Sequence, residues 1–306
     1  MAITAVWVGA VVVTALWPAL AVFAVVVDLV RRVRFATVRA LAIVTLYLWA
    51  EAIGVLVAGL IGRDQERNYA LQRRWAAVLG HGAFRIFGIH LDVSGGETLA
   101  TGPFLLLVRH AAVADVLLPM LLVANPHRLH PRYVLKRELR WDPCLDVVGS
   151  RIPNAFVNRD GTDTEAQLAL VRSMAGGLGA HDFVALYPEG TRFTPARRAR
   201  ALDRLAPADR AWAETLTRTL PPRPGGVLAL LEAAPESDVV ILAHTGMDAA
   251  TTLKDLMNGG IVHARWRVRA QRHPRATIPS EPAAQIAWLN ARWSEMDAWI
   301  SQPEPP

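Results

Sequence analysis

The chain contains almost no cysteine, and this excludes one way of stabilising a fold. Cys144 is the single cysteine among 306 residues, so no disulfide can form within the chain. His127 and His130 lie between two prolines, which makes that stretch a loop. Because no second cysteine or cluster of histidines accompanies them, we expect neither a structural nor a catalytic metal.

Lysine is also scarce, since the 33 basic residues include only Lys136 and Lys254. The formal net charge is +6, so arginine supplies nearly all of the positive charge. A positive balance suits nucleic acid, an anionic membrane or a phosphorylated substrate. No helix-turn-helix, zinc-finger or ribonucleoprotein pattern is present, and we therefore expect no nucleic-acid partner.

Charged side chains are absent from residues 2–27. A helix of that length can cross a hydrocarbon core of about 30 Å. A second apolar run, residues 40–62, is interrupted only by Glu51. Three parts of the chain are expected: a membrane-embedded helical hairpin at 1–66, a catalytic domain at 67–302 and a disordered tail at 303–306.

Arginines on both sides of the second apolar run leave its topology open. Four lie between residues 31 and 39, and four lie between residues 63 and 74. Two full spans would put these clusters on opposite sides of the membrane, against the positive-inside tendency. A re-entrant hairpin would keep both clusters at the cytoplasmic surface.

Short apolar runs bounded by polar or turn residues predict a mixed central sheet flanked by helices, which is an α/β fold. These runs are residues 104–108, 133–136, 155–159, 183–187 and 239–243, and the third ends in a cation. Residues 262–270 alternate apolar and basic side chains, and this pattern predicts a half-exposed edge strand. Polar residues that follow such strands meet in a cleft at the edge of an α/β sheet.

Chemistry-bearing residues follow three of the predicted strands. His110 and Asp115 come after the first, five positions apart, and Arg159 ends the later stretch Phe-Val-Asn-Arg. Glu189 to Arg192 form the sequence Glu-Gly-Thr-Arg directly after Tyr-Pro. A carboxylate beside an imidazole holds one tautomer and stabilises the protonated ring. The sequence therefore predicts a cleft that contains a general base and several cations.

This ordered set resembles the glycerolipid acyltransferase family, which includes lysophosphatidic acid (1-acylglycerol-3-phosphate O-) acyltransferases. The resemblance covers residues 85–246 and is also in keeping with the apolar N-terminus. It implies direct transfer of a fatty acyl group from acyl-CoA or acyl-carrier protein to the free hydroxyl of a lysophospholipid. The implied acceptor is 1-acyl-glycerol-3-phosphate, which would give phosphatidic acid. It further implies no permanently bound cofactor and a catalytic domain on the cytoplasmic side of the cytoplasmic membrane.

The resemblance also implies roles for particular residues. His110 is expected to be the catalytic base and Asp115 to orient it. The expected substrate-binding residues are Lys136, Arg159, Glu189, Gly190, Thr191 and Arg192. Within this set, Gly190 would let the backbone turn and Thr191 would cap a helix.

Residues 195–224 form an arginine-rich insertion, with seven arginines and only three acidic residues. A solvated surface segment explains this composition, and a basic wall for donor phosphates or anionic lipid is the alternative. The segment Pro-Pro-Arg-Pro-Gly-Gly, residues 221–226, resembles a segment of the longer eukaryotic-type members of the family. Its arginine, Arg223, is expected to bind the acyl donor.

Two positions depart from the family pattern. Arg109 stands where asparagine is common, and Ala112 stands where serine is common. These differences bear on the acceptor more than on the reaction type, so a different lyso-lipid or a non-glycerol acceptor is an alternative. A lipid hydrolase using His110 and Asp115 is another, although the chain lacks a Gly-x-Ser-x-Gly elbow. A catalytically silent lipid-binding protein is the third.

Overall fold

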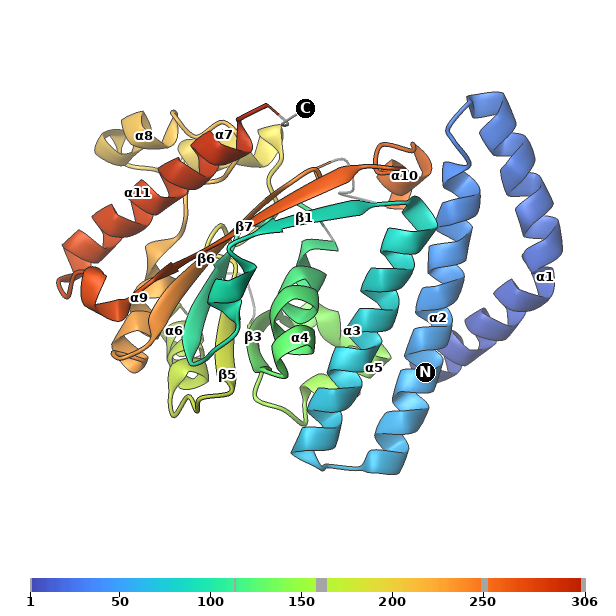
Figure 1. The fold of residues 1–306 in the computed structure, drawn as a ribbon, viewed down its shortest axis with the longest axis horizontal. Helices are drawn as coiled ribbons and strands as arrows, with labels where there is room; N and C mark the ends of the chain where they lie inside the picture. The colour runs from blue at the N-terminus through green and yellow to red at the C-terminus, as the bar shows by residue number, and fades with distance from the viewer. Residues whose placement is uncertain (1, 113, 158–163, 249–252, 304–306) are drawn as a thin grey trace.

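A mixed sheet with helices on both faces forms the centre of the protein (Figure 1). The computed structural model describes residues 2–112, 114–157, 164–248 and 253–303. In spatial order the seven strands are β1 (His90–Ser94), β7 (Arg265–His273), β6 (Asp238–Thr245), β2 (Phe104–Val108), β5 (Asp182–Leu186), β3 (His130–Lys136) and β4 (Ala155–Val157). The α/β fold predicted from the sequence is confirmed.

Strands β6, β2, β5, β3 and β4 run parallel to one another. Leu106 of β2 pairs with Ala185 of β5 on one side and with Val240 of β6 on the other. Because parallel neighbours end at the same edge, the loops after β2, β5 and β6 meet there.

Strand β7 differs from its prediction. It runs antiparallel to β6, and it is not an edge strand. Strand β1 pairs with its other side, for example Val93 with Val268. The alternating pattern arises because one face of β7 is buried and the other is only partly covered.

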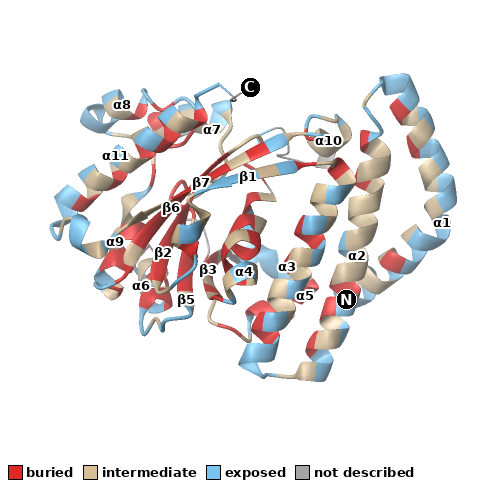
Figure 2. Ribbon diagram, in the orientation of Figure 1, coloured by how far each residue is buried: buried red, intermediate tan, exposed pale blue. Residues whose placement is uncertain are grey.

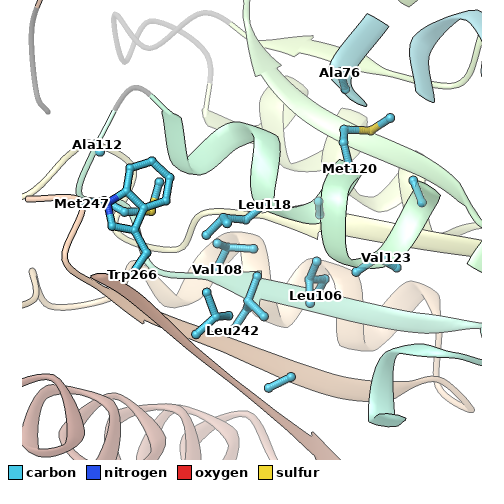
Figure 3. Packing of buried hydrophobic residues seen from close by; sticks show 14 of the residues in the cluster. Ala76, Leu106, Val108, Ala112, Leu118, Met120, Val123, Leu242, Met247 and Trp266 are labelled. Atoms are coloured by element: carbon cyan, nitrogen blue, oxygen red, sulfur yellow. The ribbon is translucent and has the colours of Figure 1, made fainter. Parts of the chain in front are cut away.

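Side chains of β2 are fully buried on both faces of the sheet, which explains its uninterrupted apolar sequence. Leu106 and Val108 lie in one core, against the short helix η3 (Met120–Ala124) and α3 (Gln65–Phe87), as Figure 3 shows for the labelled residues. Leu105 and Leu107 lie in the other core. That second core is covered by α6 (Thr164–Ala175), α9 (Pro224–Ala233) and α11 (Pro282–Ile300).

Two long apolar helices, α1 (Ala2–Arg31) and α2 (Ala36–Ile61), form a hairpin at one end of the molecule (Figure 1). Both are long and apolar enough to cross a membrane, and α1 is mostly exposed (Figure 2). At the turn between them, the buried Asp28 carboxylate accepts from the amides of Thr37 (2.9 Å) and Val38 (3.0 Å). Asp28 thereby satisfies the first amides of α2.

Helix α2 also packs along α3 and α5 (Pro143–Gly149). The buried Glu51 accepts from the indole of Trp75 and from the amide of Cys144, both at 2.9 Å. Glu51, the one charge in the second apolar run, thus joins α2 to the rest of the protein.

The arginine-rich insertion contains α7 (Pro195–Leu202) and α8 (Pro207–Ala213), next to α11 in Figure 1. The remaining helices are η1 (Gly96–Leu99), η2 (Ala114–Leu117), α4 (Asn125–His127), η4 (Arg137–Trp141), α10 (Leu253–Met257) and η5 (Arg275–Thr277).

Candidate active site

His110 and Asp115 are in contact at the carboxyl end of β2. The imidazole Nδ1 lies 3.2 Å from Oδ1 and 3.1 Å from Oδ2 of Asp115. The fully buried carboxylate also accepts from the amides of Ala111 (2.7 Å) and Ala112 (2.9 Å) through Oδ2. The loop itself therefore holds the carboxylate under the ring. The two residues paired in the sequence analysis lie together, and their catalytic role stays a prediction.

The bonds of Asp115 determine which nitrogen of His110 carries a proton. An ionised carboxylate only accepts, so Nδ1 donates and Nε2 of the neutral ring keeps a free lone pair. The His110 side chain is 14% exposed, which leaves the ring accessible. Its ring centre lies 4.9 Å from that of Tyr187, whose hydroxyl donates to the Asp115 carbonyl at 3.3 Å. This arrangement can accept a proton from a bound hydroxyl.

Glu189, predicted to bind substrate, is buried behind the histidine. Its Oε1 accepts from the amide of His110 and its Oε2 from the amide of Leu220, both at 3.0 Å. Burial raises the pKa of Glu189 to about 8, while Arg109 and the two amides act in the opposite direction. Glu189 thus links the loops after β2 and β5 to the insertion, and contact with a substrate stays a prediction.

Arg109, which departs from the family pattern, turns into the core. Its guanidinium is fully buried and donates to the carbonyls of His244 and Arg218, both at 2.8 Å. It also pairs with Asp248 at 2.6 Å. The carbonyl of Arg109 in turn accepts from Nε2 of His244 at 3.0 Å. This network fixes the backbone on the N-terminal side of His110.

His244 is a neutral member of this network. Burial, together with the positive charge of Arg109, lowers its pKa from 6.5 to about 4. Since the carbonyl of Arg109 accepts from Nε2, the proton of the neutral ring is on that nitrogen. Nε2 also lies 3.7 Å from the Asp115 carboxylate.

The Glu-Gly-Thr-Arg turn packs directly on the histidine loop. The amide of Phe193 donates to the carbonyl of His110 at 2.8 Å. Gly190 has φ +70°, and a Cβ there would lie 3.1 Å from the guanidinium carbon of Arg223. Glycine therefore suits the positive φ, and a side chain at this position would also press on the guanidinium of Arg223.

The predicted cap at Thr191 is wrong, because α7 begins later. Thr194 is the residue that caps α7, and its hydroxyl accepts from the amide of Arg197 at 3.2 Å. Thr191 and Arg192 instead belong to the turn between β5 and α7, and the carbonyl of Arg192 accepts from Arg197 at 3.2 Å.

For the other predicted site residues, Arg223, Lys136 and Arg159, the structure gives fewer contacts. The amide of Arg223 donates to the carbonyl of Pro188 at 2.9 Å, which brings this arginine to the turn. Lys136 is the last residue of β3. Arg159 lies outside the described residues, so its predicted contact with the acceptor phosphate stays a prediction. Among the described residues, no group of His, Cys, Asp and Glu could hold a metal ion.

Sequence reasoning missed most of the buried charges behind the site. Arg109, Asp248 and Asp297 come from segments far apart in the chain, and none follows a recognised motif. The one available signal was a charged residue, Arg109, directly between an apolar strand and the candidate base. His244 was noticeable only as a histidine at the end of a buried strand.

Comparison with solved structures places the fold. The crystal structure of the 1-acyl-sn-glycerophosphate (LPA) acyltransferase PlsC from Thermotoga maritima matches with a TM-score of 0.58 and 15% sequence identity. The match covers 90% of this chain and 98% of that one. At this identity the likeness shows a shared fold.

Comparison with curated proteins found no match. A protein-family model described as Acyltransferase matches residues 90–245, which is just over half of the chain. That region contains the His110–Asp115 pair, the Glu-Gly-Thr-Arg turn and six of the seven strands in full. The chain therefore belongs to the acyltransferase family.

Proposed function

We propose that the protein transfers a fatty acyl group from an acyl thioester to the free hydroxyl of a lysophospholipid. The preferred acceptor is 1-acyl-glycerol-3-phosphate and the product is phosphatidic acid. The observation that carries this proposal is the His110–Asp115 contact, in which a buried carboxylate holds Nδ1 and leaves Nε2 free. The family match supports acyl transfer, and the fold of an LPA acyltransferase supports the acceptor class.

In the proposed reaction, Nε2 of His110 removes the proton as the acceptor oxygen attacks the thioester carbonyl. Asp115 stabilises the imidazolium that forms. The tetrahedral intermediate then expels the thiolate, and His110 returns the proton to it. The hydroxyl attacks an already activated carbonyl, so no serine nucleophile and no permanently bound cofactor are required. The donor, acyl-CoA or acyl-carrier protein, acts as a co-substrate.

Three cations of the catalytic domain are proposed to hold the acceptor phosphate. Arginine suits this task because its planar guanidinium can bond two phosphate oxygens at once. The candidates are Arg159, Arg192 and Lys136, and Gly190, Thr191 and Glu189 shape the turn that contains Arg192. What supports this is the packing of the turn on the His110 loop through Phe193.

We also propose that residues 1–66 attach the catalytic domain, residues 67–302, to the cytoplasmic face of the membrane as a re-entrant hairpin. Both ends of α2 are tied to the catalytic domain. Near one end Arg39 donates to the carbonyl of Ile86, and at the other Arg151 donates to the carbonyls of Ala58 (2.6 Å) and Gly62 (2.7 Å). A full span of α2 would draw the polar surface of α3 into the hydrocarbon core, at a large cost in free energy.

Topology reporters fused after residues 36 and 70 test the hairpin. We expect both to report the cytoplasmic side, because both basic clusters then face it. Reports from opposite sides would establish a full span in place of the hairpin, and would leave the reaction proposal untouched.

The reaction is tested with purified protein in lipid vesicles, labelled acyl-CoA or acyl-carrier protein, and a panel of lyso-lipids read by mass spectrometry. We expect labelled phosphatidic acid from the wild type and almost none from His110→Ala with an unchanged thermal transition. His90→Ala, a change at an exposed histidine in β1, is the matched control and should keep full activity. Undiminished transfer by His110→Ala would refute the proposal, and release of free fatty acid without an acceptor would identify a hydrolase.

A further inference from the structure

One short segment of the insertion, Thr217–Arg223, is held by buried charges although its arginine side chains are exposed. Asp297 of α11 is 5% exposed and accepts hydrogen bonds from the segment through both carboxylate oxygens. The donors are the amides of Thr217 (3.0 Å), Arg218 (2.7 Å) and Thr219 (2.8 Å) and the hydroxyls of Thr217 (3.2 Å) and Thr219 (2.9 Å). One carboxylate thus fixes three consecutive residues.

The catalytic side of the protein holds the same segment. Arg109, adjacent to the candidate base, donates to the carbonyl of Arg218 at 2.8 Å. Glu189, which also bonds the amide of His110, accepts from the amide of Leu220 at 3.0 Å. Both backbone groups of Arg218 are therefore bonded, one by Asp297 and the other by Arg109.

Holding a surface segment in this way is costly. Burying a charged side chain costs on the order of several kcal/mol in lost hydration free energy. Only hydrogen bonds of good geometry within the protein offset that cost. A solvated loop does not need such support. The buried charges instead preorganise the segment, which lowers the entropy lost when its side chains bind a ligand.

The side chains presented by this segment are Arg218 and Arg223, and both are exposed. Among the described residues, neither guanidinium makes a hydrogen bond or an ion pair. Two other arginines of the insertion, Arg198 and Arg210, are instead bonded within the protein. Arg198 bonds the carbonyls of Leu216 (2.6 Å) and Glu214 (2.7 Å), and Arg210 pairs with Glu214 at 2.8 Å. Two cations are thus left for a ligand on a backbone that cannot easily move.

Their position separates them from the lipid side of the molecule. The guanidinium of Arg223 lies against Gly190, in the turn that packs on the His110 loop. Helices α7, α8 and α11 lie at the opposite end of the molecule from α1 and α2 (Figure 1). A lipid acceptor would reach the site from the hairpin, whereas a water-soluble substrate can reach it from the insertion.

We propose that Thr217–Arg223 binds the phosphate of the acyl donor, a phosphopantetheine thioester, through Arg218 and Arg223. Acyl-CoA and acyl-carrier protein share that phosphate next to the pantetheine arm. Guanidinium groups bond phosphate oxygens with matching geometry. Asp297, Arg109 and Glu189 act as positioning residues, because they hold the backbone of the segment and do not themselves bind the phosphate. This inference rests on the acyl transfer proposed above.

The test compares donors with and without phosphate. Wild type, Arg218→Ala, Arg223→Ala and the double variant are assayed in vesicles with acyl-CoA, acyl-carrier protein and acyl-pantetheine, which has the thioester but no phosphate. We expect each single variant to raise KM for the phosphorylated donors about tenfold or more, as for a lost charge-assisted hydrogen bond. The preference for acyl-CoA over acyl-pantetheine should fall by the same factor, and KM for the lyso-lipid should not change.

Arg204→Ala is the matched control, because it removes the same charge from an exposed position of the same insertion outside the segment. It should leave KM for acyl-CoA unchanged. An equal loss with both phosphorylated donors assigns the arginines to the shared phosphate, and a loss with acyl-CoA alone assigns them to its nucleotide phosphates.

Four results would overturn the inference: a loss with acyl-CoA alone, equal losses with acyl-CoA and acyl-pantetheine, a rise in KM for the lyso-lipid instead of the donor, or the same effect in Arg204→Ala. Failure of the proposed function looks different, since the wild type would then transfer no acyl group from any donor.

Discussion

The side chain of Glu189 accepts a hydrogen bond from the backbone amide of His110 at 3.0 Å, although the two residues are 79 positions apart. The parallel pairing of β2 with β5 brings them together, because the two strands end at the same edge of the sheet. The second oxygen of Glu189 bonds Leu220 in the insertion. One buried residue thus joins the candidate base, the Glu-Gly-Thr-Arg turn and the proposed donor-binding segment.

Replacing Glu189 by alanine should lower both stability and activity. The change leaves the buried amides of His110 and Leu220 without an acceptor, at a cost of about 1–3 kcal/mol for each. We expect a lower melting temperature and a fall in kcat larger than the loss of folded protein explains. Glu236→Ala, at an exposed position, should change neither. A fully active Glu189→Ala would show that the histidine loop needs no support from this side.

Asp115→Asn should impair the reaction more than the fold. Asparagine retains one acceptor oxygen but cannot stabilise an imidazolium, and its NH2 group faces groups that themselves donate. We expect kcat to fall by roughly 10²–10⁴-fold, the range for loss of such a carboxylate in other His-based sites. Transfer measured at saturating donor and acceptor checks this. A fall of less than a few-fold would mean that Asp115 only shapes the loop.

Gly190→Ala should separate backbone strain from contact with Arg223. A non-glycine residue at φ +70° costs about 1–2 kcal/mol. The new methyl group would also displace the guanidinium of Arg223. We expect reduced stability together with a raised KM for acyl-CoA. Gly177→Ala, at φ +59° with nothing within 4 Å, should show the strain alone, and equal kinetics in the two variants would contradict the contact.

His244 should make the folded protein sensitive to acid. Its folded pKa of about 4 lies below the ordinary value of 6.5, so between these values the unfolded chain binds more protons. The contribution of His244 is therefore complete above pH 6.5 and is lost as the pH falls towards 4. It amounts to about 3 kcal/mol at most.

Melting temperatures of wild type and His244→Gln from pH 7 to 4 measure this contribution. Glutamine can donate to the carbonyl of Arg109 but does not titrate. The difference between the two proteins also removes the opposite slope expected from Glu189, whose pKa is raised. Parallel pH dependences would show that the titration of His244 does not govern acid stability.

Much of the fold was predictable from local patterns. Uninterrupted apolar runs such as residues 104–108 indicated strands buried on both faces, because helices cover both sides of a parallel sheet. Strand β7 was predicted to lie at the edge of the sheet, and this was wrong. Its alternation of apolar and basic side chains shows that one face is only partly covered, but it does not show whether another strand lies beside it. The predicted cap at Thr191 was wrong because the helix begins four residues later, at Pro195, where Thr194 is the cap. The sequence offers two threonines close together, and it does not show at which of them the turn after β5 ends.

The sequence by itself determined the fold class, the apolar hairpin and the pairing of His110 with Asp115, because these depend on periodicity or on residues close together in the chain. Only the tertiary structure decided what surrounds that pair. Arg109, Glu189 and His244 follow or end three neighbouring strands, whose order and direction bring them together behind the site, and Asp297 of α11 holds the segment that Arg109 and Glu189 also bond. The partner of a buried charge is set by where the chain returns in space, which no local pattern records.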